Sequence, residues 1–199
     1  DLFWGTSSEV NAFIPSFVGQ KFNHFPFSKK LLGDKAELTR IIQTSPRFSS
    51  YEPFFPRTFV LPQDQEALNA EMKAHPSRMY VAKPPKGSGG NGIEVVNSSN
   101  RLTIPSGSVV QQYIAHPLTI DDFKFDLRIY VLVTSYLPLR AYLFKEGLAR
   151  FATETYKTST RNRYSHLTNA HLNKESPHWS SDFKWKLSEL LNEVQHRYN

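Results

Sequence analysis

The stretch Lys124-Phe125-Asp126-Leu127-Arg128-Ile129-Tyr130 decides how the fold is interpreted. Because successive side chains of a strand point to opposite faces, its three charged side chains share one face and the apolar ones between them share the other. The apolar continuation at residues 131–133 predicts a buried strand. Buried charges are costly unless they are paired or face a polar ligand. We therefore expect a polar ligand against this strand; a salt-bridged strand that faces solvent is the alternative.

A glycine-rich turn at residues 82–93 reads Ala-Lys-Pro-Pro-Lys-Gly-Ser-Gly-Gly-Asn-Gly-Ile. Its glycines match the dinucleotide fingerprint, but that fingerprint opens a helix, and here β-rich residues 93–96 follow. A P-loop is excluded because Ile93-Glu94 stands where Lys-Ser/Thr is required. A strand–loop–strand flap remains, in which glycines let backbone N–H groups approach phosphate oxygens. Lys83 precedes this flap, whereas the lysine of protein kinases follows theirs. A plain hairpin turn is the alternative.

Two later segments also carry polar side chains that a ligand could use. Arg150 stands between small and apolar residues, either as a surface charge or as a fork for a carboxylate or phosphate. The run His166-Leu167-Thr168-Asn169 follows. His166 and His171 are five residues apart, which does not place two metal ligands on one helical face, so polar contact with a nucleotide or substrate is favoured over a metal site.

Composition narrows the class of protein. The 199 residues are 39% hydrophobic and 14% aromatic, which indicates one large or two small folded domains. The net charge of +6 favours an acidic partner, whether nucleic acid, anionic lipid, nucleotide phosphate or an acidic protein tail. Lysine and arginine do not form the clustered runs of a nucleic-acid binder, and no apolar run approaches the ~20 residues of a membrane span. The lack of cysteine excludes disulfides, thiol nucleophiles and cysteine-type zinc sites.

The sequence pattern predicts an α/β chain. Residues 1–30 are aromatic and loop-like, and they lack both an initiator methionine and a signal peptide, so the chain is expected to be a fragment. Helices are expected at 35–42, at 63–75 and near the end, where Phe183, Leu187, Leu190, Leu191 and Val194 form an apolar stripe. Strands are expected at 57–61, 79–82, 93–96, 109–114, 123–136, 140–144 and 148–153.

Together these segments resemble the tubulin tyrosine ligase-like family of ATP-grasp ligases, and within it the polyglutamylases. The matching stretches follow the family's order over residues 3 to 191. They are Asn23-His24-Phe25-Pro26, residues 56–62, residues 82–93, Gln111-Gln112-Tyr113-Ile114 with Pro117-Leu118, residues 124–128, Thr134-Ser135-Tyr136 with Pro138-Leu139-Arg140, residues 147–151 and residues 166–169.

The resemblance implies an ATP-grasp-type α/β fold with mixed and antiparallel sheets and flanking helices. Residues 1–24 would end an N-terminal region, residues 25–120 would form a central domain with the glycine-rich flap, and residues 121–199 would form an incomplete C-terminal domain. The family's later Asp and its Glu-x-Asn metal motif are not found up to Asn199, so the Mg²⁺ ligands are expected beyond that residue and none is assigned here.

The resemblance also implies site residues. Arg150 is the expected catalytic residue and holds the incoming amino acid. The nucleotide contacts would be Lys35, Lys83, Gly89, Gly90, Gln111, Gln112, Tyr113, Ile114, Lys124, Phe125, Asp126, Thr168 and Asn169. The substrate contacts would be Arg128, Arg150, His171 and Lys184, with Lys174 competing for the role of Lys184. Two positions depart from the family pattern: Gly89 stands where Gln or Arg is usual, and His171 where a serine is usual.

The implied chemistry is ATP-driven amide formation with Mg²⁺. A carboxylate of a tubulin tail takes the γ-phosphate of ATP, and the amine of a free amino acid, expected to be glutamate, then attacks it. Cations are needed because anions crowd together in such a site. The expected location is the cytoplasm, on the microtubule cytoskeleton, in a cilium or basal body. The alternative is a catalytically inactive module that binds nucleotide or tubulin. Neither nucleic acid nor membrane is an expected partner.

Overall fold

The structure is a computed structural model that describes residues 2–13, 19, 21–23, 25, 28–51, 54–84, 89–99, 104–159 and 162–198. Residues 85–88 of the expected flap lie outside this set, as do His24, Pro26 and Asn199. The chain divides into two compact units. Unit 1 contains residues 1–78, 82–85 and 98–112, and unit 2 contains residues 79–81, 86–97 and 113–199.

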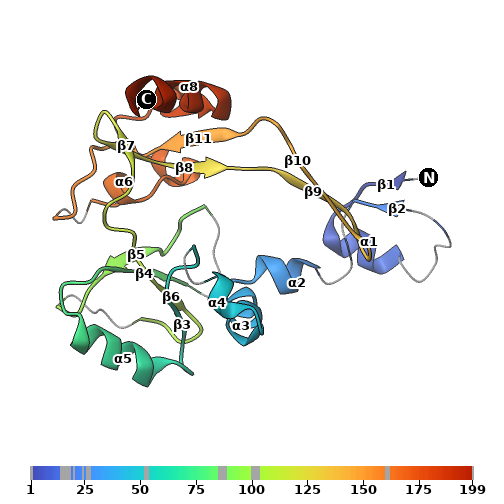
Figure 1. The fold of residues 1–199 in the computed structure, drawn as a ribbon, viewed down its shortest axis with the longest axis horizontal. Coiled ribbons are helices and arrows are strands. Elements are labelled where there is room, and N and C mark those ends of the chain that lie inside the picture. Colours follow the sequence, from blue (N-terminus) through green and yellow to red (C-terminus); the bar gives the residue numbers. More distant parts are fainter. Residues whose placement is uncertain are drawn as a thin grey trace. The chain divides into compact units, whose positions relative to one another are not determined.

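The fold is mixed α/β, as predicted (Figure 1). The helices are α1 (Ser7–Phe13), α2 (Ser28–Gly33), α3 (Lys35–Thr44), α4 (Phe48–Tyr51), α5 (Gln65–Ala74), α6 (Arg163–His166), α7 (Ala170–Asn173) and α8 (Leu187–Tyr198). The strands are β1 (Leu2–Phe3), β2 (Lys21–Phe22), β3 (Thr58–Val60), β4 (Tyr80–Lys83), β5 (Glu94–Val96), β6 (Val109–Gln112), β7 (Thr119–Ile120), β8 (Phe123–Arg128), β9 (Val131–Tyr136), β10 (Leu139–Leu143), β11 (Leu148–Phe151) and β12 (Lys184–Lys186). No helix within the described ranges has the length and apolar character needed to cross a bilayer.

Unit 1 is organised around the antiparallel pair of β3 and β6, in which Thr58 lies opposite Gln111. These strands belong to a four-stranded sheet with the order β3-β6-β4-β5. Leu68 and Met72 lie on one face of α5 and are buried, as the apolar pattern predicted. Helix α3 begins at Lys35. The Asp34 carboxylate caps it by accepting hydrogen bonds from the backbone N–H groups of Ala36 and Glu37.

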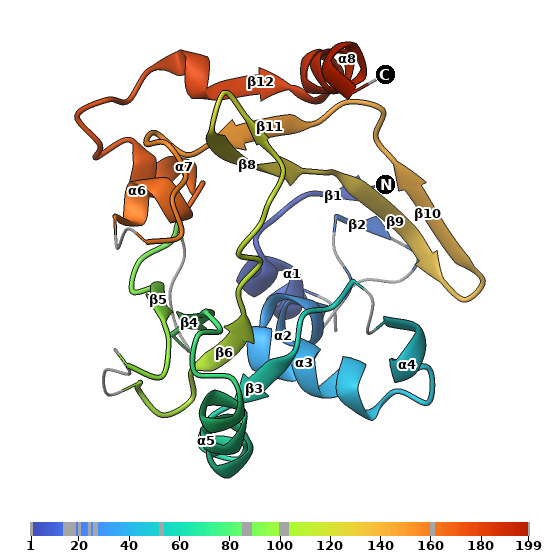
Figure 2. The ribbon, with the colours of Figure 1, turned by 60° about the vertical axis from the view of Figure 1, so that its left-hand side comes forward.

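Unit 2 contains an antiparallel sheet with the order β12-β11-β8-β7 (Figure 2). Its apolar face forms a buried cluster of Ile120, Ala149, Phe151 and Leu190, the last of these from α8. Gly147 is required where β11 begins, because a Cβ atom there would lie 2.6 Å from the Arg128 backbone oxygen. The sheet therefore has an apolar face covered by α8 and an opposite face that is left for polar side chains.

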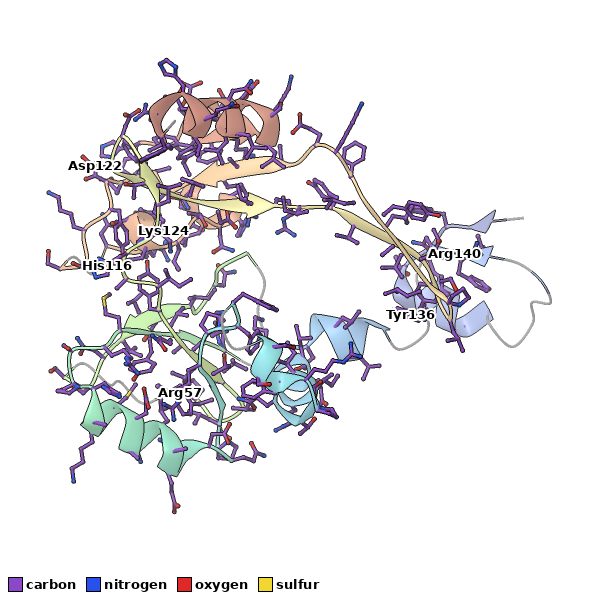
Figure 3. The ribbon with its side chains drawn as sticks, viewed as in Figure 1. Arg57, His116, Asp122, Lys124, Tyr136 and Arg140 are labelled. Carbon is purple, nitrogen blue, oxygen red and sulfur yellow. The ribbon has the colours of Figure 1, made fainter. Side chains whose placement is uncertain are left out.

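The hairpin of β9 and β10 overturns one expectation. Residues 131–133 were expected to be buried, but Val131 is 59% exposed and Leu132 is 62% exposed. The predicted strand at 123–136 is interrupted after Arg128, and β9 then pairs with β10 in a separate two-stranded ribbon, which carries Tyr136 and Arg140 (Figure 3). The apolar composition correctly predicted that residues 131–133 form a strand. It did not predict that this strand pairs with β10 in a separate two-stranded sheet.

The two ends of the chain also differ from the prediction. Residues 1–30 are not simply loop-like, because they contain α1, α2, β1 and β2. Helix α1 begins with a capping box that the sequence shows as Thr6-Ser7-Ser8-Glu9: the N–H of Thr6 donates to Glu9 at 2.6 Å and the N–H of Glu9 donates to the Thr6 hydroxyl at 3.3 Å. Near the other end, Phe183 lies in a 3₁₀ turn (Ser181–Phe183), outside α8, and Leu191 is 54% exposed.

Candidate functional site

Lys83 ends β4 in unit 1 and is held by neutral partners. Its ammonium group donates to Gln111 Oε1 at 2.6 Å. The Gln111 amide in turn donates to the Thr58 hydroxyl at 2.9 Å, and that hydroxyl donates to the Pro56 carbonyl oxygen at 2.6 Å. This relay fixes the direction of the lysine side chain. Thr58 was not singled out from the sequence, since its role depends on the register that places it opposite Gln111.

The surroundings of Lys83 disfavour its own charge. Burial lowers the pKa of the Lys83 ammonium group, and the positive charge of Lys35 lowers it further. Within the described residues, neither lysine takes part in an ion pair. Two cations close enough to repel each other, with one of them partly buried, form a place where an anion is stabilised. The structure thus brings together three of the predicted nucleotide contacts, Lys35, Lys83 and Gln111.

The segment after β6 was expected to contact the base of a nucleotide. The Gln112 N–H donates to the Arg57 carbonyl oxygen at 2.8 Å, and the Tyr113 N–H donates to the Met79 carbonyl oxygen at 2.9 Å. Tyr113 is buried, whereas the Ile114 side chain is 61% exposed. Of these three side chains, only that of Tyr113 joins other predicted site residues in the described part of the structure.

Lys124 on β8 is a second half-buried lysine, and it lies in unit 2 (Figure 3). Its ammonium group donates to the Tyr113 hydroxyl at 3.0 Å and to the His166 carbonyl oxygen at 2.7 Å. Burial lowers the pKa of Lys124 to about 8, although the nearby Asp126 carboxylate partly opposes this. Like Lys83, it is an ammonium group whose hydrogen-bond acceptors are neutral oxygens.

Asp126, Arg150 and Lys184 form a row across three neighbouring strands. Arg150 on β11 lies opposite Asp126 on β8 and opposite Lys184 on β12. The Arg150 guanidinium donates through Nε to Asp126 Oδ1 at 2.9 Å and through Nη2 to Asp126 Oδ2. This bidentate pairing raises the pKa of Arg150. The Lys184 ammonium group lies over the Trp179 ring, 5.2 Å from its centre.

The predicted faces of β8 are confirmed. Phe125 points away from the charged row, and its ring lies 5.5 Å from that of Phe151 beside the apolar cluster. Any nucleotide contact by Phe125 would therefore use its backbone. Arg128 shares the face of Lys124 and Asp126, and it is exposed at the end of β8.

The described end of the flap packs against the segment that follows α6. Gly89 and Gly90 have backbone φ angles of +70° and +99°, which residues other than glycine rarely adopt. A Cβ atom at Gly89 would lie 3.0 Å from the His171 ring, and one at Gly90 would lie 3.0 Å from the Asn169 side chain. The two departures from the family pattern, Gly89 and His171, therefore touch each other, so the small residue leaves space for the large one.

The segment 166–169 is held by Asn173, whose importance the sequence did not show. Asn173 is completely buried. Its amide group donates to the carbonyl oxygens of Leu167 at 2.7 Å and Asn169 at 3.1 Å, and its carbonyl oxygen accepts from the N–H and the hydroxyl of Thr153 at 3.1 and 2.9 Å. Thr168 is buried within the segment that these bonds fix.

The family resemblance implies two groups, a nucleotide and Mg²⁺, and the described residues differ in how they fit each of them. The half-buried cations Lys83 and Lys124 fit a nucleotide, because each is partly desolvated and keeps at least one N–H for a ligand. A magnesium site is a different matter: the described residues contain no group of three or more His, Cys, Asp or Glu side chains arranged to hold a metal.

The described residues form a mixed α/β fold with antiparallel sheets and flanking helices, which is of the ATP-grasp type. A sequence model described as "Tubulin-tyrosine ligase family" matches residues 14–199. The chain belongs to the tubulin-tyrosine ligase family.

Relatives of known activity are similar over almost the whole chain. Tubulin monoglutamylase TTLL4 of Mus musculus is 38% identical over 202 residues, which cover 95% of this chain and 17% of that protein. Tubulin polyglutamylase TTLL5 of Mus musculus is 38% identical over 208 residues, 96% of this chain and 15% of that protein. Tubulin polyglutamylase TTLL6 of Homo sapiens is 37% identical over 189 residues, 90% of this chain and 21% of that protein. The chain thus spans about a fifth or less of the length of these relatives.

Proposed function

We propose that this protein is an ATP-dependent ligase that adds glutamate to carboxylates of tubulin tails. The observation that carries the proposal is a pair of half-buried lysines whose ammonium groups donate to neutral oxygens, Lys83 to Gln111 and Lys124 to Tyr113 and His166. A fold gains no stability from desolvating an ammonium group without a counterion. A bound polyanion such as ATP supplies the missing negative charge.

The nucleotide contacts follow from the two groups of residues described above. In unit 1, Lys83 and Lys35 would hold phosphate oxygens, and Gln111 would keep Lys83 in place. In unit 2, Lys124 would offer its remaining N–H, and Gly89 and Gly90 their backbone N–H groups, to a nucleotide. The other predicted contacts, Gln112, Ile114, Phe125, Asp126, Thr168 and Asn169, would contribute through backbone or polar atoms. When bound, ATP supplies a phosphoryl group that turns a carboxylate into a reactive electrophile.

The amino acid site would lie along the row of Arg150 and Lys184. Glutamate carries two carboxylates, and one arginine holds one of them in a bidentate manner, so a second cation is needed for the other. The register places Lys184 directly opposite Arg150. Because Asp126 already accepts from two nitrogens of Arg150, the incoming carboxylate would use the third nitrogen, Nη1, or displace Asp126. Arg128 and His171 are further substrate contacts in this proposal.

The partner and the location follow from the relatives. The relatives TTLL4, TTLL5 and TTLL6 are a tubulin monoglutamylase and two tubulin polyglutamylases. A net charge of +6 suits the acidic tails of tubulin. We therefore place this protein in the cytoplasm on microtubules, with Mg²⁺ accompanying its ATP, and a cilium or basal body is one setting where such microtubules occur.

The test is transfer of labelled glutamate to tubulin by the purified full-length protein with ATP and Mg²⁺, because residues 1–199 alone, without the expected Mg²⁺ ligands, should be inactive; mass spectrometry of the tubulin tails detects the transfer. We expect incorporation that requires ATP and that is lost in Lys83→Met. Lys73→Met is the matched control, because Lys73 is an exposed lysine in the last turn of α5 and should leave transfer unchanged. Nucleotide binding without any transfer would instead assign the protein to inactive modules that bind nucleotide or tubulin.

A further inference from the structure

Lys124 lies in a cage of aromatic side chains and a backbone carbonyl that was not recognised in the sequence. Its ammonium group is 3.0 Å from the Tyr113 hydroxyl and 2.7 Å from the His166 carbonyl oxygen. The same Tyr113 hydroxyl lies 3.0 Å from His166 Nδ1. Tyr113 and His166 are 8% and 1% exposed, so solvent contributes little to this arrangement.

The protons of the cage determine what Lys124 can still bind. An ammonium group has three N–H donors and no acceptor, so the Tyr113 oxygen must accept from Lys124. The His166 carbonyl oxygen accepts a second N–H. One N–H remains, and its direction is set by the two that are held.

Further contacts between aromatic rings hold Tyr113 and His166 in place. The Tyr113 and Tyr156 rings each lie 5.5 Å from the His166 ring, edge to face. The Tyr156 hydroxyl donates to the Ala115 carbonyl oxygen at 2.8 Å, which ties this ring to the segment that follows Tyr113. Three stretches of the chain that are distant in sequence thus fix one lysine.

We propose that Tyr113 and His166 are positioning residues that hold the Lys124 ammonium group in the direction needed to contact the nucleotide. The proposal rests on the proposed function for the identity of the ligand, but the positioning itself can be tested without a ligand. Neither aromatic side chain touches a reacting atom in this scheme, because both act through Lys124.

The titratable groups around Lys124 are the Asp126 carboxylate, the phenols of Tyr113 and Tyr156, and the His166 imidazole. Burial is the main cause of its lowered pKa, and the Asp126 carboxylate partly restores it. Burial also raises the pKa of Tyr113, with the neighbouring Tyr156 contributing, so the phenol stays neutral at physiological pH. The remaining group is the His166 imidazole beside the Tyr113 hydroxyl. A neutral phenol oxygen that accepts from the ammonium group favours its charged form, so removal of that oxygen should lower the pKa of Lys124 further.

The first test titrates Lys124 in the ligand-free full chain by NMR of ¹³Cε-labelled lysine. Tyr113→Phe removes only the hydroxyl group, and Tyr164→Phe is the matched control, since the Tyr164 hydroxyl accepts from Arg163 in the same region. We expect the midpoint of Lys124 to fall by about half to one pH unit in Tyr113→Phe and to stay unchanged in Tyr164→Phe. Equal midpoints in both variants would overturn the proposal. If Tyr113→Phe does not fold, His166→Gln replaces it, with the same expected direction.

The second test measures ATP affinity by calorimetry at pH 7.5. We expect a loss of about fivefold in Tyr113→Phe, the scale of one hydrogen bond, and no loss in Tyr164→Phe. In a Lys124→Met background, Tyr113→Phe should cause no further loss, because its effect passes through Lys124. An undiminished loss in that background would contradict the positioning role. If the wild-type chain binds no ATP, the proposed function fails, while the ligand-free titration still decides the positioning role.

Discussion

Asn173 and Lys83 are both polar side chains that the fold shields from water, but they differ in how many of their possible hydrogen bonds are made. Asn173 uses both of its amide hydrogens and both acceptor positions of its oxygen on Thr153, Leu167 and Asn169. Lys83 uses one of three hydrogens, on Gln111. A buried polar group with every hydrogen bond satisfied stabilises the fold, whereas one with donors to spare is prepared for a ligand. Lys124 and Arg150 lie between these two extremes.

The largest effect is expected at Arg150. Arg150→Ala should lower glutamate transfer by at least about a hundredfold, the scale for loss of one preorganised cation or donor in an active site. ATP affinity should change little, because Arg150 is assigned to the amino acid. Arg163→Ala is the control, since Arg163 forms an exposed pair with Glu175. A variant of Arg150 that retains transfer would show that its pairing with Asp126 is purely structural.

The opposite extreme is tested at Asn173. Asn173→Ala leaves the Thr153 N–H and two backbone carbonyl oxygens without their buried partner, and it should lower the free energy of unfolding by about 3 kcal/mol. Urea denaturation measures this value, with Asn192→Ala on the exposed side of α8 as the control. A loss below about 0.5 kcal/mol would mean that the four hydrogen bonds around Asn173 do not hold the segment 166–169.

Lys184 should affect the choice of amino acid rather than the reaction. Lys184→Ala should weaken the use of glutamate about tenfold relative to glycine, because glycine has no side-chain carboxylate to lose. Competition between the two labelled amino acids measures the ratio, and Lys174→Ala tests the competing lysine. An equal loss for both amino acids would remove Lys184 from the substrate site.

A smaller effect is expected from pH, and its sign is fixed by Lys124. With a pKa of about 8, the ammonium form declines as the pH rises from 7.5 to 9, so ATP affinity should fall about fivefold. The stability of the ligand-free fold should change in the opposite direction. In the unfolded chain Lys124 keeps its proton up to about pH 10.5, its ordinary pKa. The free energy of unfolding should therefore rise between pH 8 and 10.5. Lys124→Arg, which stays charged, should remove the fall in affinity across this range.

The sequence predicted the parts of the molecule that depend on local pattern. The two faces of β8 and helices α3 and α5 follow from alternation and apolar spacing, whereas the roles of Lys83 and Arg150 stay predictions. What it could not predict depends on partners that are distant along the chain. The exposure of β9, the role of Thr58 behind Gln111 and the bidentate pairing of Arg150 with Asp126 are set by strand register. The capping box at Thr6 was readable but was overlooked among the aromatic residues around it.

Lys83 provides the most direct test of whether the lysines with unused N–H groups bind a nucleotide. Calorimetric titration with ATP at pH 7.5 should show affinity about 10- to 150-fold lower in Lys83→Met than in the wild type, which corresponds to the ~1.5–3 kcal/mol of a hydrogen bond to a charged group. The thermal midpoint should stay close to that of the wild type, because Lys83 gives little to the fold itself. Unchanged ATP affinity in Lys83→Met would contradict the assignment of this lysine, and with it the central claim.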